Sequence, residues 1–158
     1  MFSAAVIPSK YRPDDYTDVG QAQVLARVSG CELRYSPATD YIVYNGVNWE
    51  ESKHGAQAVA QKLTAHQMEE AEALAKTAWE SMVSSGAAEI LAQSTKKKAE
   101  SMFSKTQRAA YARYAGAVEY RKFSLDRRGS RNITNTLKEA RPMLAITPKD
   151  LDADCYLL

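Results

Sequence analysis

The spacing of apolar residues predicts helices over most of this chain, with one short segment of strands near the N-terminus. The first helix is expected between Thr17 and Gly30. Thr17 or Asp18 can cap its first turn, and Gly30 is well placed to end it. Its apolar stripe consists of Ala22, Leu25 and Ala26.

Alternating and β-branched residues after this helix predict a three-stranded antiparallel meander at about residues 32–50. Residues 32–36 and 41–44 form the first two strands, and Asn45-Gly46 is a strong hairpin signal. Trp49 is expected in the core. Arg34 points away from its apolar neighbours, so we expect it to form a structural ion pair.

The pattern is helical from residue 53 to about residue 141. A short helix is expected over residues 53–63. Thr64 and Gln67 have the spacing of a capping box that would open a separate long helix, and Gly86 would end it.

Further capping signals divide the second half of the chain. Residues 87–93 form one or two turns, and Ser94 or Thr95 can cap the lysine-rich segment that follows. Ser104 and Gln107 form another capping box that starts a helix through about residue 123. The apolar stripe of that helix is predicted to be Tyr111, Tyr114 and Val118.

A break at residues 126–129 precedes the last predicted helix, residues 130–141, which Pro142 should end. Its inward side consists of Ile133, Leu137 and Ala140. A turn and a short apolar strand at residues 155–158 follow. The fold class is therefore mainly α (α+β), a helical bundle with a small N-terminal antiparallel meander. Residues 1–16 are an extended lead-in, and residues 17–158 form a single domain.

Charge is divided unevenly, although the formal net charge of the 158 residues is only +2. Residues 1–89 hold 7 Lys/Arg against 12 Asp/Glu, whereas residues 96–141 hold 13 against 4. An excess of this size attracts polyanions. It also permits head-to-tail docking of the basic half on the acidic half of a second copy.

The basic half predicts contact with DNA phosphates. Three consecutive lysines cannot all be buried on a helix, and three arginines lie around the start of the last helix, where anions bind favourably. Tyrosines interleaved with these charges could stack on unpaired bases or belong to the core. A solvated basic surface is the alternative. The candidate residues are Lys96, Lys97, Lys98, Lys105, Arg108, Arg127, Arg128 and Arg131.

Catalytic and metal-binding motifs do not occur in the sequence. There is no phosphate-binding loop for ATP, and His54 and His66 lack partners at metal-ligand spacing. The alternating aspartates at residues 150–154 lack the glycine and the distal glutamate of a calcium loop. Cys31 and Cys155 are expected to be free thiols. No catalytic residue, metal, cofactor or membrane span is expected.

The first helix and the meander carry a set of residues in a fixed order and spacing: Asp18, Gly20, Ala22, Leu33, Arg34, Tyr35, Tyr44, Gly46 and Trp49. In these residues the region resembles the helicase-associated N-terminal domain of phage, plasmid and poxvirus primase–helicases. Gln21 stands where that family usually has Asn, and Tyr41 where it often has Trp. A second matching stretch runs from Ser130 to Leu158.

This resemblance implies a non-catalytic collar or accessory domain that helps to engage DNA and to assemble a ring. It implies a covalently following superfamily 3 helicase as partner, from which the chain would be truncated, and the cytoplasm of a bacterial host as location. DNA, single-stranded or forked, would be bound with low specificity, and the domain could self-associate. The alternatives are a pure oligomerisation module without DNA binding and an independent phage-encoded regulator.

Overall fold

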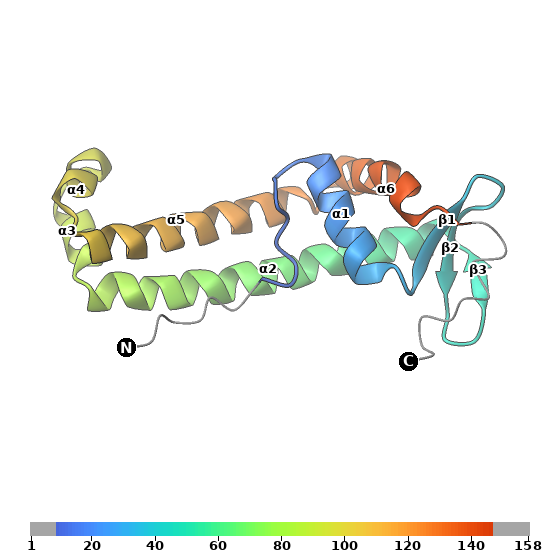
Figure 1. Ribbon diagram of the computed structural model, residues 1–158, viewed down its shortest axis with the longest axis horizontal. Coiled ribbons are helices and arrows are strands. Elements are labelled where there is room, and N and C mark those ends of the chain that lie inside the picture. The colour runs from blue at the N-terminus through green and yellow to red at the C-terminus, as the bar shows by residue number, and fades with distance from the viewer. Residues whose placement is uncertain (1–8, 147–158) are drawn as a thin grey trace. The chain divides into compact units, whose positions relative to one another are not determined.

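The computed structural model describes residues 9–146, which contain six helices and three strands (Figure 1). The chain divides into two compact units. The first unit comprises Met1–His66 and Asp126–Leu158, and the second comprises Gln67–Leu125. The predicted fold class is confirmed, because a small antiparallel sheet near the N-terminus accompanies a majority of helix.

Helix α1, Asp18–Ser29, opens the first unit as predicted. Of the two candidate caps, Thr17 acts, since its side chain accepts a hydrogen bond from the Gly20 amide at 3.0 Å. The helix ends before Gly30, which has the right-handed φ of −62°. Gly30 therefore ends the helix without the left-handed conformation that often favours glycine at this position.

The predicted meander is confirmed as strands β1 (Leu33–Ser36), β2 (Asp40–Tyr44) and β3 (Trp49–Glu51), in that spatial order. Leu33 lies opposite Val43, and Tyr44 opposite Trp49. The β2–β3 loop spans residues 45–48, which is longer than a two-residue turn. Asn45 Oδ1 accepts from the amides of Val47 and Asn48, both at 2.8 Å, and Gly46 supplies a φ of +96°.

Two expectations for the meander are wrong. Trp49 is only partly buried, because β3 lies at the edge of the sheet and the indole contacts Tyr44 at a ring-centroid distance of 5.4 Å. Arg34 forms no ion pair with any residue between 9 and 146. The ion pair that links distant parts of the first unit is made by Arg127 instead.

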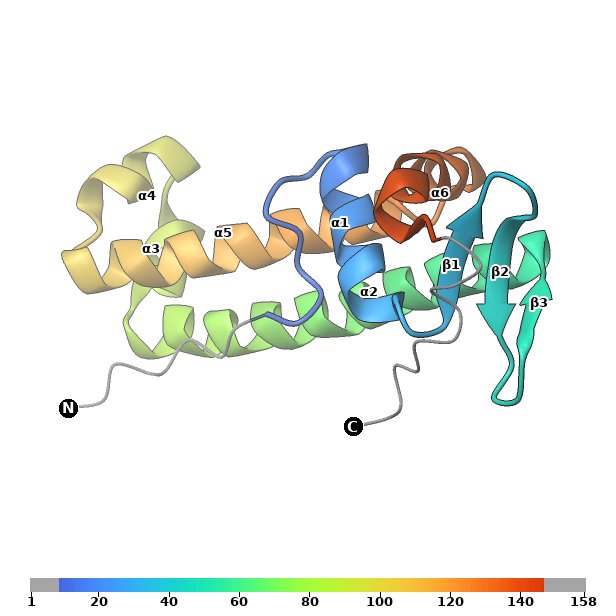
Figure 2. The same ribbon diagram turned by 45° about the vertical axis from the view of Figure 1, so that its right-hand side comes forward.

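The core of the first unit lies between α1, the sheet, the start of α2 (Lys53–Ser84) and α6 (Ser130–Leu144). Figure 2 shows α1 and α6 side by side, with β1 next to them. The buried Tyr41 hydroxyl donates to the Leu137 carbonyl. Beyond α6, the Ile146 amide donates to the Tyr35 carbonyl at 2.9 Å, which joins the chain to β1. The largest fully buried members of the core are Leu25, Leu33, Leu144 and Val24.

Helix α2 is continuous over 32 residues, so the predicted break at Thr64 is wrong. Thr64 is buried inside the helix, and its hydroxyl donates to the Gln61 carbonyl at 2.6 Å. Gln67 is also fully buried rather than capping a helix start. No proline precedes Thr64 in this helix, and Gly55 lies in its first turn, so nothing interrupts the backbone hydrogen bonds.

The second unit contains the end of α2, then α3 (Ala87–Gln93), α4 (Lys96–Met102) and α5 (Lys105–Asp126), whose last residue belongs to the first unit. Within it, α5 runs back antiparallel beside α2 (Figures 1 and 2). Gly86 ends α2 as predicted, with a φ of +82°. Thr95, not Ser94, caps α4.

The predicted capping box at the start of α5 is confirmed. The Gln107 amide donates to Ser104 Oγ at 3.2 Å, and the Ser104 amide donates to Gln107 Oε1 at 2.9 Å. Gln107 Nε2 also donates to the Ser85 carbonyl at 2.8 Å. The predicted apolar stripe is displaced, because Val118 is 44% exposed. The buried positions of α5 are Ala110, Ala117, Tyr120 and Ser124.

Helix α6 continues through Pro142 to Leu144, so the predicted stop at residue 141 is wrong. Pro142 lies in the last turn and is exposed, where it removes a single backbone N–H. Two residues later Leu144 is 1% exposed, and its burial favours continuing the helix. Ile133 and Ala140 face inward as predicted. The predicted strand at residues 155–158, the aspartates at 150–154, Cys155 and the first half of the lead-in lie outside the described residues.

Candidate nucleic-acid interface

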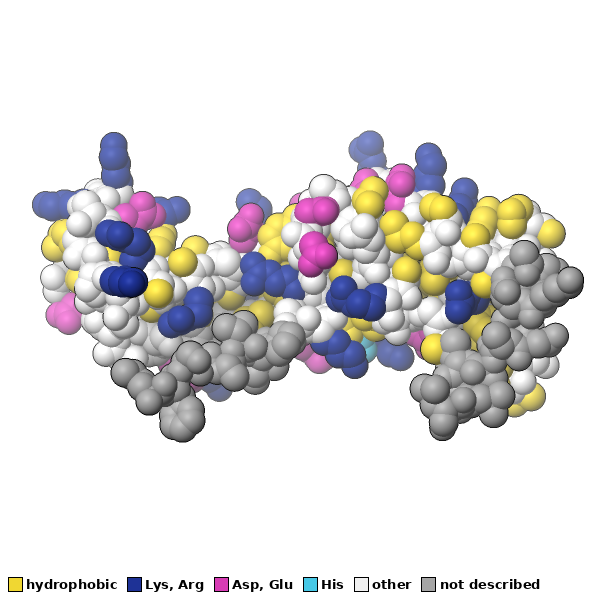
Figure 3. Space-filling model, in the orientation of Figure 1, with side chains coloured by type: hydrophobic (Ala, Val, Ile, Leu, Met, Phe, Trp, Pro, Cys, Tyr) yellow, Lys and Arg dark blue, Asp and Glu magenta, His cyan; other side chains and the backbone are white. Residues whose placement is uncertain are grey.

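One side of α6 carries a row of exposed cations, which we call the α6 stripe: Arg128, Arg131, Lys138 and Arg141. Arg128 lies in the turn before the helix, and the other three follow at spacings of seven and three residues. These spacings bring side chains to the same side of a helix. Figure 3 shows Lys and Arg side chains projecting from this region. Within residues 9–146 no carboxylate forms an ion pair with any of the four.

Arg127, predicted to contact phosphate, lies inside the first unit. Arg127 is only 6% exposed, and its guanidinium Nη1 donates a hydrogen bond to Asp18 Oδ1 at 2.5 Å. The other terminal nitrogen donates to the Asn132 carbonyl at 3.1 Å and to Thr136 Oγ1 at 2.6 Å. The side chain therefore joins the start of α1 to the first turns of α6.

This arrangement explains two residues of the sequence motif. Asp18 supplies the carboxylate for Arg127 from the first turn of α1. Gly20, in the same first turn, packs against the chain before the helix. A Cβ at this position would overlap the Asp15 carbonyl oxygen and lie 2.5 Å from Asp15 Oδ1. Both residues thus position α1 within the first unit.

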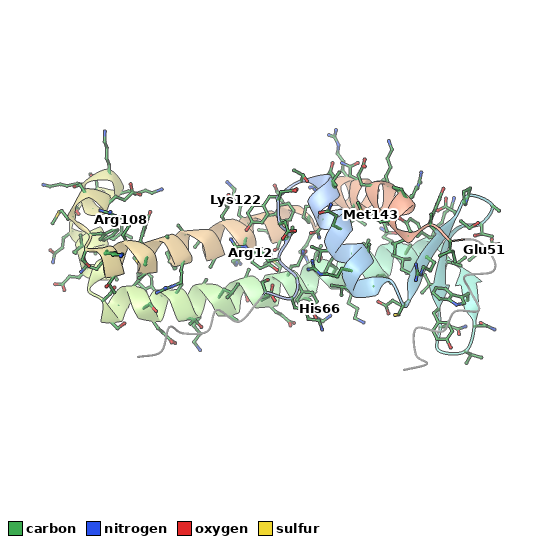
Figure 4. All side chains as sticks on the ribbon, viewed as in Figure 1. Arg12, Glu51, His66, Arg108, Lys122 and Met143 are labelled. Carbon is green, nitrogen blue, oxygen red and sulfur yellow. The ribbon has the colours of Figure 1, made fainter. Side chains whose placement is uncertain are left out.

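The second unit holds a separate basic group, which we call the α4 cluster. All of its residues are exposed, and Figure 3 shows Lys and Arg side chains gathered over α4. Thr95 caps α4 by accepting from the Lys98 amide at 3.3 Å. Figure 4 labels Arg108 in the first turn of α5, beside α4. The members of the cluster are Lys96, Lys97, Lys98, Lys105 and Arg108.

The aromatic residues interleaved with these charges are largely occupied by packing. Tyr120 is fully buried and donates to Glu70 at 2.8 Å. Tyr111 contacts Phe103, and Tyr114 contacts Trp79, at ring-centroid distances of 5.4 and 5.2 Å. Of these residues Trp79 is the most exposed, at 43%.

The described residues contain no grouping of three His, Cys, Asp or Glu side chains that could hold a metal ion. His66 stacks on Tyr11 at a ring-centroid distance of 5.1 Å, and Cys31 is exposed. None of the helices between residues 9 and 146 combines the length and hydropathy that crossing a bilayer requires.

The fold is thus a mainly helical domain with a small meander and two basic groups. A family model described as D5 N-terminal-like matches residues 22–158, which is most of the chain. The chain belongs to this family, the N-terminal domain of phage and viral primase–helicase proteins, and is a replication-associated domain. No curated protein and no solved structure matches it.

Two members of the α6 stripe, Lys138 and Arg141, were not among the residues predicted from the sequence to contact phosphate. Both follow Arg131 at helical spacing, so the signal was present in the periodicity of the charges. Both residues lie inside the helix predicted over residues 130–141, but the predicted contacts in this part of the chain comprised only the three arginines at 127–131. The structure separates that triplet into the inward Arg127 and the exposed Arg128 and Arg131.

Proposed function

We propose that this domain holds DNA by its phosphate backbone for a helicase domain that follows it in a phage-type replication protein, and that it performs no chemistry itself. The observation that carries the proposal is the α6 stripe, a row of exposed cations on α6 and the turn before it that form no ion pair among the described residues. Lys and Arg neutralise phosphates and release counterions, which gives affinity without reading bases.

The geometry favours a positioned contact over a flexible one. Arg127 fixes the turn and the first part of α6 to α1 through Asp18, so the neighbouring Arg128 and Arg131 extend from a constrained backbone. From Arg131 to Arg141 the helix rises about 15 Å. This length spans several phosphates of a strand, and the binding is therefore expected to be of low sequence specificity.

The α4 cluster supplies a second contact in this proposal. Lys96, Lys97 and Lys98 lie on a short helix, and Lys105 and Arg108 lie at the start of the next one. Because the five cations of this cluster are exposed, they can follow a flexible strand. The protein would act in the cytoplasm of a bacterial host.

Ring assembly is the second candidate function. In one version of this candidate the domain self-associates and binds no DNA. The second unit exposes several large apolar side chains, which favour protein contacts when they form a patch. Light scattering of the purified domain tests this candidate independently of DNA. The exposed apolar residues of the second unit, each 43–58% exposed, are Trp79, Val83, Met102, Val118 and Leu125.

The experiment for DNA contact compares two variants that lose the same charge. Arg128→Ala/Arg131→Ala removes two cations from the α6 stripe. The control, Lys76→Ala/Lys122→Ala, removes two exposed cations outside both basic groups. Fluorescence anisotropy with a labelled single strand is measured over a series of salt concentrations. Each lost phosphate contact lowers the slope of log affinity against log salt by about 0.7.

We expect the slope to fall by about 1.4 in the stripe variant and to change much less in the control. Equal slopes in the two variants would contradict a specific role for the stripe. Arg127 is left intact in this comparison, because its substitution would perturb the fold and confuse stability with binding. Thermal unfolding of both variants verifies that they remain folded.

A further inference from the structure

A groove of about 320 Å³ lies within the first unit, between α6, the first turn of α2 and the start of β2. Its floor includes Tyr41 and Ile133, both buried. The volume is at the lower end of the range for small-molecule sites, and it suits one phosphate group with part of its sugar better than a duplex. The charged residues that line it are Asp40, Lys53, Lys138 and Arg141.

Three cations and one carboxylate therefore face the groove. Lys53 comes from α2, whereas Lys138 and Arg141 come from α6, so the positive charges approach from two elements. The three cations form no ion pair within the part of the chain that the structure describes. The Asp40 carboxylate already accepts from the Tyr41 amide at 2.8 Å.

Packing holds one of these cations in place. The Arg141 guanidinium carbon lies 5.5 Å from the centre of the Tyr35 ring, a cation–π contact. Lys53 is the first residue of α2, whose first turn contains no acidic residue. The positive end of this long helix, where Ser52 Oγ accepts from the Gly55 amide at 2.8 Å, adds to the field of the lysine. Two labels in Figure 4 help to locate these cations: Glu51 lies two positions before Lys53, and Met143 lies two positions after Arg141.

We infer that this groove binds one phosphate group of a DNA single strand that runs along the α6 stripe. Lys138 and Arg141 belong to both the stripe and the groove, so a strand on the stripe brings its phosphates to the groove. Lys53 is the additional residue, and it extends the contact from α6 to α2. The inference rests on the proposed function and specifies where a phosphate would be enclosed rather than merely attracted.

The test uses Lys53→Gln, with Lys62→Gln as a matched control on the same helix. Both lysines are exposed and both substitutions remove one charge, but Lys62 does not line this groove. The salt dependence of single-strand affinity is measured for both, beside the unsubstituted domain. We expect the slope to fall by about 0.7 for Lys53→Gln only. A second measurement follows backbone amide signals of residues 53–57 and 138–141 by NMR during titration with the same oligonucleotide or with inorganic phosphate.

Each outcome decides between the two proposals. If Arg128→Ala/Arg131→Ala lowers the slope but Lys53→Gln and Lys62→Gln behave alike, the groove inference is wrong and the proposed function stands. If the unsubstituted domain binds no strand, the proposed function fails and the groove inference fails with it. Amide shifts with inorganic phosphate but none with the oligonucleotide would overturn the strand as the ligand, leaving a small-anion site. Shifts with the oligonucleotide that Lys53→Gln abolishes would support the inference.

Discussion

Asp18→Asn isolates the ion pair that joins α1 to the start of α6. The substitution keeps the size of the side chain but removes the charge that Arg127 faces at 2.5 Å. The two partners differ in exposure, since the Arg127 side chain is 7% exposed and that of Asp18 is 43% exposed. Loss of the carboxylate therefore removes the negative charge that Asp18 places beside a buried cation.

The expected cost follows from these exposures. Breaking a fully buried pair from one side costs about 3–5 kcal/mol. Because Asp18 is nearly half exposed, water already screens part of the attraction, and we expect about 2–3 kcal/mol. The exposed Asp14 provides the control, and Asp14→Asn should change the free energy of unfolding by less than about 0.5 kcal/mol.

Urea unfolding measures this cost for the first unit alone if one tryptophan is removed. The chain has two, and Trp79→Phe leaves Trp49 of the first unit as the fluorescent probe. With an m-value of about 2 kcal/mol/M, Asp18→Asn should lower the midpoint by about 1–1.5 M. In an Arg127→Met background the same substitution should cost at most about 1 kcal/mol, the charge–dipole contribution at a helix start. Equal midpoints for Asp18→Asn and Asp14→Asn would refute the structural role of the pair.

Two further predictions concern the first unit. Gly20→Ala should destabilise it, because the new Cβ would overlap the Asp15 carbonyl oxygen; Gly129→Ala, whose Cβ would come no closer than 3.5 Å to its neighbours, should be neutral in the same urea assay. Burial raises the pKa of the Tyr41 hydroxyl above its ordinary value of about 10, so the folded state keeps a proton that the unfolded chain loses in alkali. The contribution of Tyr41 to stability is therefore complete below pH 10 and falls above it by up to about 1.4 kcal/mol per pH unit. Urea unfolding between pH 8 and pH 11 should show a shallower loss for Tyr41→Phe than for the unsubstituted domain, and parallel losses would contradict the assignment.

Local signals in the sequence predicted most element boundaries. The capping-box spacing, however, marks a helix start at one of its two occurrences and lies inside a helix at the other. Ser104 and Gln107 form a true capping box because Phe103, before them, has an extended backbone with ψ of 136°. Thr64 and Gln67 have the same spacing inside a continuous helix, since nothing before them interrupts it. A capping motif therefore predicts a helix start only where the preceding chain leaves the helical conformation.

The candidate interface was harder to predict from the sequence than the fold. Arg127 and Arg128 are adjacent, and only the first faces inward. Its partner Asp18 lies 109 positions away in the sequence, so no local pattern could distinguish the two arginines. Likewise, Lys53 shares a groove with Lys138 and Arg141 only because α2 and α6 pack in the same unit.

The capping residue Gln107 also determines how the lysine-bearing segment is attached to the rest of the second unit. Gln107 forms hydrogen bonds with both Ser104 and the Ser85 carbonyl, and it thereby joins the two ends of the segment that contains α3 and α4. Buried side chains anchor the same segment, because Ala87, Ala99 and Phe103 share one cluster with Met82 of α2 and Ala110 of α5. The lysines of α4 therefore extend from a backbone that is held both by hydrogen bonds at its ends and by packing along its length.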